Sequence, residues 1–424
     1  MAAGWRERRG ATPEGVIRKH HGDRLIVIFT VLLMFIGLLV IYAIGPQRAN
    51  LMNSVFGFEY DSGYFFWKQL LSIGLALGAF WAMSVVPYNF VLKHGAKVLW
   101  AGFIACALLA VGYWVGVIEA TNGAARWIEL GPLGSVQPAE ILKFGLLLYL
   151  AVFLAVRVKT GKINDWKETL LPVAAIAGFA VLFVIGIQKD LGTGISLTAI
   201  IVAMLFVAGI NKKIIFSLFG VLLVAGMVMI FTSPHRVERV MTYLQGDNTS
   251  TEDADAYHIQ HAKIAIGSGG MFGVGIGSSV QASGYLPESM NDSIFAIIGE
   301  TFGFVGTVAL LGLFVALLMR LLSVMDGMID LRLKLLAAGV FGWLGAHVIL
   351  NIAAMIGIFP LTGITLPLLS YGGTSMIFIA AALGLVFQLS KYTVHSSRIK
   401  EATDEDSRSR RGVRRTRYAS RRGA

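Results

Sequence analysis

The residues best suited to chemistry lie in one stretch, Tyr285–Phe304, which reads YLPESMNDSIFAIIGETFGF. A predicted apolar helix starts there at about residue 293, and either Asn291 or Asp292 is a suitable N-cap for it. Asp292 has a second interpretation, because a carboxylate at such a boundary can also act as a general base. Glu300 lies two turns further on, about 12 Å along a helix and roughly 80° around it. The two carboxylates are not the closely spaced pair of a retaining glycosidase, so any carboxylate chemistry here uses a single base.

Other charged residues fall within or beside apolar runs, where an unpaired charge costs several kcal/mol. Glu140 and Lys143 are three residues apart at the start of one run, which favours either an ion pair or a functional role for the lysine. Arg126 is the lone cation of the preceding link and could face an anionic headgroup. Asp190, in QKDLGTG, opens another run and is either its N-cap or part of a site. Ser370 and Gly372, in LPLLSYGGTS, are predicted to form a polar mouth where backbones approach closely.

Two further patterns favour structural interpretations. The glycine-rich stretch GSGGMFGVGIG at 267–277 lacks the GK[ST] ending of a phosphate loop, and no predicted strand precedes it. It is therefore predicted to be a close-packed turn beside membrane helices. His258 and His261 would share a helix face, but no third metal ligand lies nearby in the sequence, and the identity of any metal stays unknown.

The composition explains what must position these residues. The chain has 424 residues, of which 56% are hydrophobic and 14% charged, with a mean hydropathy of +0.70. Apolar runs long enough to cross about 30 Å of hydrocarbon recur along it, which predicts an all-α polytopic membrane protein. Ten transmembrane helices are predicted, at 24–44, 64–86, 96–117, 138–157, 169–188, 191–210, 213–232, 293–320, 334–358 and 370–391.

Basic residues set the predicted topology. Lys and Arg gather in both tails and in the even-numbered links, so both termini are predicted to be cytoplasmic. The large loop between spans 7 and 8, residues 233–292, is then extracytoplasmic, and a helix is predicted in it over Tyr257–Ile266. A basic N-terminal tail (1–23) and a disordered basic C-terminal tail (396–424) flank the membrane domain (24–395). The net charge of +11 is thus explained by membrane topology, and no nucleic-acid partner is expected.

Several separated motifs together resemble the SEDS family of membrane proteins, which contains FtsW and RodA. The resemblance covers about residues 20–395 and rests on NGAARWIELGPLGSVQPAEILK, QKDLGTG, AIGSGGMFGVGIGSS, YLPESMNDSIFAIIGETFGF and GITLPLLSYGGTS. The stretches TLPLLSYGG and HRVERVMTYL are more similar to the cell-division branch, FtsW, than to RodA. The resemblance implies a ten-span peptidoglycan glycosyltransferase that polymerises lipid II at the outer face of the bacterial cytoplasmic membrane, at the division septum.

The same resemblance carries roles to particular positions. Asp292 falls on the essential loop aspartate of the family, and Glu300 on the first acid of its GEE triplet. The other matching positions, expected to bind substrate, are Arg126, Glu140, Lys143, Asp190, Ser370 and Gly372. Departures from the usual pattern are Met290 and Asn291 in place of His-Thr, Lys189 in place of Pro, Thr301 in place of Glu and Thr374 in place of Ser.

The implied reaction joins the 4-hydroxyl of one lipid-linked disaccharide to the anomeric carbon of another and expels a polyprenyl pyrophosphate. Asp292 would be the general base, made more basic by partial exclusion of water. Arg126 and Lys143, or a divalent cation such as Mg²⁺ or Mn²⁺, would stabilise the leaving group. No organic cofactor is expected. The implied partners are a class B penicillin-binding protein, which supplies the transpeptidase, and other division proteins.

Three other functions remain open from the sequence. A lipid II flippase would also have ten spans and buried charges, but its polar groups should line a path through the membrane. Here they concentrate at the predicted outer ends of the spans. A lipid-linked sugar ligase would have a similar architecture and a different acceptor. A scaffold that recruits division proteins through its basic tail is compatible with catalysis, although attraction of the tail to anionic lipid is favoured.

Overall fold

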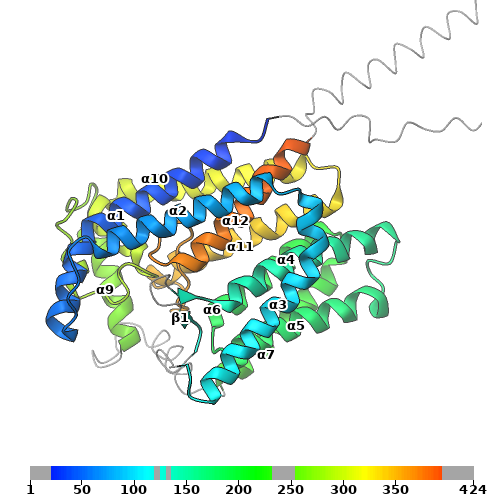
Figure 1. Cartoon of the computed structure of the whole chain (residues 1–424), viewed down its shortest axis with the longest axis horizontal. Coiled ribbons are helices and arrows are strands. Elements are labelled where there is room, and N and C mark those ends of the chain that lie inside the picture. Colours follow the sequence, from blue (N-terminus) through cyan, green and yellow to red (C-terminus); the bar gives the residue numbers. More distant parts are fainter. Residues whose placement is uncertain (1–20, 119–124, 130–134, 232–253, 394–424) are drawn as a thin grey trace, which may run out of the picture.

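The computed structural model describes residues 21–118, 125–129, 135–231 and 254–393, which are mostly helical (Figure 1). Within these residues each predicted span is a helix. Eight helical segments are long and apolar enough to cross a membrane, and α6 is a shorter apolar helix. The helices that match the predicted spans are α1 (Arg24–Phe56), α2 (Tyr64–Val85), α3 (Tyr88–Trp114), α4 (Pro138–Lys159), α5 (Leu171–Gly186), α6 (Leu191–Val207), α7 (Lys212–Phe231), α10 (Ile294–Asp326), α11 (Leu331–Met355) and α12 (Gly373–Leu389).

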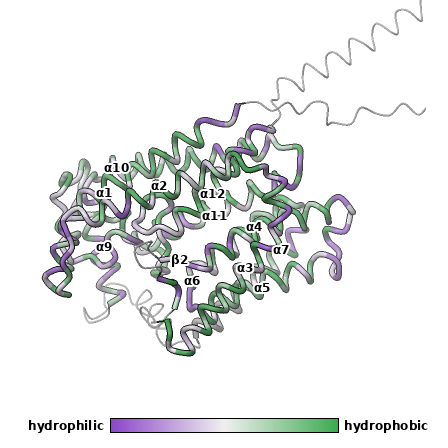
Figure 2. Tube along the Cα trace, in the orientation of Figure 1, coloured by the Kyte–Doolittle hydropathy of each residue, from purple (hydrophilic) through white to green (hydrophobic). Residues whose placement is uncertain are grey.

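The helices form two groups that meet at α4, α11 and α12 (Figure 1). In one group α1, α2 and α10 lie along α11 and α12. In the other, α3, α5 and α6 contact α4, and α7 packs on α5 and α6. The three central helices bury most of their surface, whereas the peripheral helices expose apolar side chains outward. Hydrophilic residues collect near the two ends of the bundle and in the loops (Figure 2), as expected for an integral membrane protein.

Glycines allow α3 and α4 to pack closely. A Cβ atom on Gly102 would lie 2.6 Å from the Cα of Leu142, and one on Gly145 would lie 2.5 Å from the backbone of Leu99. Small residues at such positions let membrane helices approach along their backbones. This contact fixes α4, which carries two of the candidate site residues.

The glycine-rich stretch completes a broken helix. Gly303 has φ +67° and interrupts α10, which leaves peptide groups on both sides of the break without helical partners. The loop supplies them. Val274 N and Gly275 N donate to the carbonyls of residues 300 and 301 at 2.9 and 3.1 Å, and residues 304 and 305 donate to those of Gly270 and Met271 at 2.8 and 3.1 Å. The prediction of a close-packed turn is therefore confirmed.

Three predicted boundaries were wrong by more than a few residues, one of them the end of α10, which lies at Asp326 rather than at residue 320. Helix α1 ends at Phe56 rather than at residue 44, continuing through Pro46 to a left-handed cap at Gly57. Its extension packs on the loop that precedes α10, where Gln47 Nε2 donates to the carbonyl of Gly277 at 3.1 Å. Helix α3 begins at Tyr88 rather than at residue 96, because the basic first turns omitted from the prediction pack against α4.

The remaining elements lie in two links. In the link before α4, strands β1 (Ile128–Glu129) and β2 (Ser135–Val136) form a short antiparallel hairpin. In the long loop, α9 (Ala254–Ser268) matches the predicted helix and is followed by the 3₁₀ turn η5 (Gln281–Ser283). Short turns η3 (Trp166–Leu170) and η6 (Ser390–Tyr392) precede α5 and follow α12. The tails at 1–20 and 394–424, together with residues 119–124, 130–134 and 232–253, lie outside the described residues.

Candidate functional site

Asp292 lies in the turn before α10, with a half-buried side chain. The backbone of this turn is held from the side of α11 and α12. Three successive carbonyls, those of residues 290, 291 and 292, accept hydrogen bonds from Tyr371 N at 2.8 Å, Ser370 Oγ at 2.6 Å and Asn351 Nδ2 at 2.6 Å. These hydrogen bonds fix the backbone position from which the Asp292 side chain extends. A residue that acts as a general base needs such a fixed position.

The start of α10 differs from the prediction. The N-cap is Ser293 rather than Asn291 or Asp292, and Ser293 makes no side-chain cap hydrogen bond. Its hydroxyl instead donates to the carbonyl of Pro287 at 2.9 Å, so the ring of His258 donates to Ser293 Oγ at 2.5 Å. The N-cap therefore lies one residue beyond Asp292, which stays in the preceding turn.

Residues 361–372 form an irregular segment that other elements hold in place. Ser370, 5% exposed, accepts from Leu366 N at 2.8 Å while it donates to the turn before α10. Gly372, with φ +132°, is the N-cap residue of α12. A backbone turn occupies the position of the predicted polar mouth, and the buried hydroxyl of Ser370 positions the Asp292 loop. The close approach of backbones expected at Gly372 is not found, because a Cβ there would meet nothing within 4 Å.

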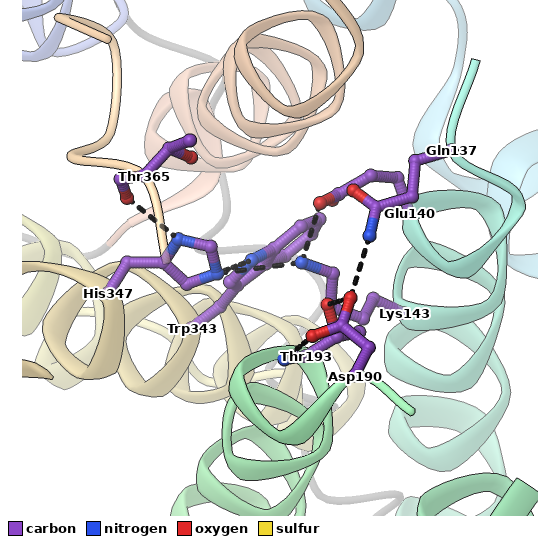
Figure 3. A network of polar contacts seen from close by, with 8 residues as sticks. All are labelled: Gln137, Glu140, Lys143, Asp190, Thr193, Trp343, His347 and Thr365. Atoms are coloured by element: carbon purple, nitrogen blue, oxygen red, sulfur yellow. Dashed lines mark hydrogen bonds and ion pairs between the residues drawn. The ribbon is translucent and has the colours of Figure 1, made fainter. Parts of the chain in front are cut away.

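Lys143 and Glu140 form a buried ion pair between α4 and α11 (Figure 3). The Nζ atom of Lys143 lies 2.8 Å from Glu140 Oε1 and 3.5 Å from His347 Nε2, with the ring of Trp343 4.9 Å away. The lysine side chain is 0% exposed. Among the described residues Glu140 Oε2 has no hydrogen-bond partner. The ion-pair interpretation of these residues is correct.

Hydrogen bonds assign the protonation of His347. Its Nδ1 lies 3.3 Å from the carbonyl of Thr365, to which it must donate, and its Nε2 accepts from Trp343 Nε1 at 3.2 Å (Figure 3). The imidazole is therefore neutral, which suits a ring beside the ammonium of Lys143. This ring links the ion pair to the irregular segment.

Asp190 is the N-cap of α6, as one of its two interpretations predicted. Its Oδ1 accepts from Thr193 N at 3.0 Å, and its Oδ2 accepts from Thr193 Oγ1 at 2.8 Å and Gln137 Nε2 at 2.9 Å. Gln137 directly precedes α4, so this carboxylate ties the start of α6 to the start of α4 (Figure 3).

Arg126 is the half-exposed cation of the site. Its Nη2 donates to the carbonyl of Lys189 at 2.7 Å, and its Nη1 lies beside Gly363 of the irregular segment. Its Nε has no hydrogen-bond partner among the described residues. Unlike Lys143, this guanidinium can reach a ligand without rearrangement of the helices.

A polar stripe on α11 joins these parts. Trp343, His347 and Asn351 are spaced four residues apart and so lie on one face of the helix. Asn351 Nδ2 donates both to the Asp292 carbonyl and to that of Ile364, at 2.6 and 2.7 Å. The stripe thus connects the ion pair at one end to the Asp292 turn at the other. This stripe was not predicted, although polar residues at helical spacing in an apolar span are a signal for it.

Glu300 is separate from this group. Its carboxylate, 2% exposed, accepts hydrogen bonds from Val280 N at 2.9 Å, Gln281 N at 3.3 Å and Ser279 Oγ at 2.5 Å. These bonds cap η5 and anchor the loop after α9. In this conformation the carboxylate is wholly engaged in that anchoring.

The described part of the chain does not bring three His, Cys, Asp or Glu side chains together as metal ligands. His261 contacts the amide oxygen of Gln281 at 2.7 Å, whereas His258 contacts Ser293. The two histidines therefore contact different partners and do not by themselves fit a divalent cation.

The model of the FtsW/RodA/SpoVE family, described as cell cycle proteins, matches residues 23–395. The chain belongs to this family. It is 34% identical over 381 residues to the stage V sporulation protein E of Bacillus subtilis, an alignment covering 89% of this chain and 99% of that protein. It is 33% identical over 376 residues to the probable peptidoglycan glycosyltransferase FtsW of Coxiella burnetii, covering 88% and 96%.

Solved structures agree with this membership. RodA of Thermus thermophilus, a rod shape determining protein, is similar with a TM-score of 0.61 and 25% identity over 88% of this chain and 98% of RodA. A chain of a peptidoglycan synthase complex, studied for the coordination of polymerization and crosslinking, gives a TM-score of 0.65 at 27% identity over 87% and 98%. The polytopic helical fold of the family is therefore shared.

The structure shows the conformation or the contacts of four residues that depart from the family pattern. Lys189 has φ +53°, which a proline could not adopt, and its carbonyl is the acceptor for Arg126. Met290 is buried and Asn291 donates to the carboxylate of Glu288. Thr374 Oγ1 donates to the Ser135 carbonyl at 2.5 Å, a bond that a serine could also make.

Proposed function

We propose that this chain is a peptidoglycan glycosyltransferase that polymerises lipid II, with Asp292 as its general base. The observation that carries the proposal is the Asp292 turn, which is held by three carbonyl hydrogen bonds and lies at the same irregular segment as the half-exposed Arg126. Relatives over most of the chain, named as probable peptidoglycan glycosyltransferases, supply the substrate class.

In the proposed reaction the Asp292 carboxylate takes the proton of the acceptor 4-hydroxyl as its oxygen attacks the anomeric carbon of the donor. A new glycosidic C–O bond forms, and the bond from the anomeric carbon to the pyrophosphate breaks. Arg126 stabilises the negative charge on the departing polyprenyl pyrophosphate. Lys143, being enclosed, positions α4 against α11 instead of contacting substrate.

We further propose that all ten helices span the membrane, with both termini in the cytoplasm and the Asp292 turn at the outer face. Lipid II would reach it from the outer leaflet. A class B penicillin-binding protein would crosslink the product at the division septum. The similarity to a chain of a peptidoglycan synthase complex and the relatives named FtsW support this assembly.

Replacing the carboxylate tests the base. In purified protein with labelled lipid II, Asp292→Asn is expected to slow formation of glycan ladders by about 10²–10⁴-fold, the usual contribution of a general base. Glu288→Gln, which changes an exposed carboxylate in the same turn, should retain polymerisation and serves as the matched control. Ladders formed by Asp292→Asn at the wild-type rate would exclude this residue as the base.

A transport assay separates the flippase alternative. Liposomes containing the wild-type chain and fluorescent lipid II should show polymerisation without net movement of lipid II between leaflets. Movement without polymerisation would favour a flippase. Transfer of the glycan to a different lipid-linked acceptor would favour a ligase.

A further inference from the structure

A cavity of about 420 Å³ lies between the first turns of α3 and the last turns of α4. Residues of two turns line it on each helix, with Leu92 and Ala96 on α3 facing Val152 and Val156 on α4. Beside it, Gly95 lets the backbones of α3 and α4 approach closely at Leu148. The apolar walls are wide enough for part of an acyl chain, and this size is typical of small-ligand sites.

Two cations stand at the mouth of this cavity. Lys93 is exposed and makes no hydrogen bond or ion pair with any residue that the structure describes. Arg157, in the last turn of α4, packs over the ring of Phe153 at 5.1 Å and donates to Glu168 at 2.7 Å. A guanidinium has five N–H donors, so others stay available.

The charges around the mouth leave a positive excess. Glu168 is shared by Arg157 and by Lys162 at 2.5 Å, and one further carboxylate, that of Asp165, lies beside it and accepts from Glu168 N at 2.8 Å. Lys93 adds a third cation to that group. A ligand with an apolar tail and a negative head would therefore match both halves of the cavity.

We propose that this cavity binds an anionic phospholipid, with its phosphate at Lys93 and Arg157 and an acyl chain between Ala96 and Val152. Basic pockets between membrane helices recognise anionic headgroups in this way. A soluble anion would not use the apolar walls, and a zwitterionic lipid would add its own cation to a mouth that is already positive.

Native mass spectrometry of the full chain tests the proposal, with phosphatidylglycerol and phosphatidylcholine offered in equal amounts. The wild-type chain should retain phosphatidylglycerol preferentially. Lys93→Gln should weaken that preference about fivefold, the effect of one cation near a membrane surface. Lys97→Gln, an exposed lysine one turn along α3 that does not line the cavity, should leave the preference unchanged.

A second variant tests the acyl-chain part. Ala96→Trp fills the cavity without changing charge and should abolish the tightly retained lipid, with folding checked by its melting temperature. Equal preference in wild type and Lys93→Gln, or an equal loss in Lys97→Gln, would overturn the proposal. So would undiminished retention by Ala96→Trp, or displacement of the lipid by millimolar inorganic phosphate, since either would indicate a headgroup site alone.

Discussion

Lys143 has no exposed surface, and its charge is balanced by Glu140 within the same helix. Lys143→Met should destabilise the protein by about 3–5 kcal/mol, because it leaves the Glu140 carboxylate buried without its partner. The melting temperature in detergent measures this. Lys159→Met, at the exposed end of the same helix, should change little.

The double variant distinguishes an unbalanced charge from lost packing. Adding Glu140→Gln to Lys143→Met removes both charges and should restore most of the lost stability. If the double variant melts no higher than Lys143→Met, the pair does not act through charge balance.

Asn351 is predicted to be a positioning residue for Asp292. Asn351→Asp keeps the shape of the side chain but removes the NH₂ that donates to two carbonyls. Polymerisation should fall about 100-fold in kcat with a small change in KM, because the turn shifts while the substrate surface stays. Steady-state kinetics of lipid II consumption measure both.

The matched variant for that experiment is Ser370→Ala, which removes one bond to the same turn and should have a smaller effect in the same direction. Unchanged kcat in both variants would show that the turn holds its position without these bonds.

At the scale of the elements, α10 depends on a loop from outside itself. Gly303→Ala would place a Cβ 2.4 Å from Gly273 N and force alanine to φ +67°. We expect a loss of stability of about 2 kcal/mol or more, read from thermal unfolding in detergent.

The control is Gly312→Ala in the same helix, where a Cβ meets nothing within 4 Å. This variant should be neutral or slightly stabilising, because alanine favours helix over glycine. If both substitutions changed the melting temperature equally, the helix break at residue 303 would tolerate a Cβ atom, and the prediction would be wrong.

The elements were largely predictable because long apolar runs leave few alternatives to helices. The errors were at helix ends, where contacts with other parts of the chain, and not only the apolar run, decide which residues are helical. The polar end of α1 continues as helix because it packs on the loop before α10, and no periodicity in residues 45–56 signals that partner. Likewise, α10 begins after Ser293, whose hydroxyl contacts the ring of His258, 35 residues earlier in the chain, and this contact has no signal in the local sequence.

At the scale of the whole molecule, the candidate site was only partly predictable. The sequence marks charged residues in apolar runs, and so Arg126, Asp190 and the ion pair of α4 were all found. It does not say which of them meet. Asn351 and His347 bring the Asp292 turn and the ion pair to one irregular segment, and that arrangement arises only when α11 packs against α4 and α12.

The ion pair of α4 also bears on how the chain is made. Lys143 and Glu140 are one helical turn apart, whereas Trp343 and His347 are synthesised some two hundred residues later. A lone lysine or acidic residue opposes insertion of a helix by roughly 2.5–3.5 kcal/mol at the helix centre, and by less near the start of a helix such as α4. Because the two charges neutralise each other within α4, this helix can enter the bilayer before its later partners leave the ribosome. Insertion of α4 therefore does not depend on α11, which is synthesised later and contributes Trp343 and His347 to the same site.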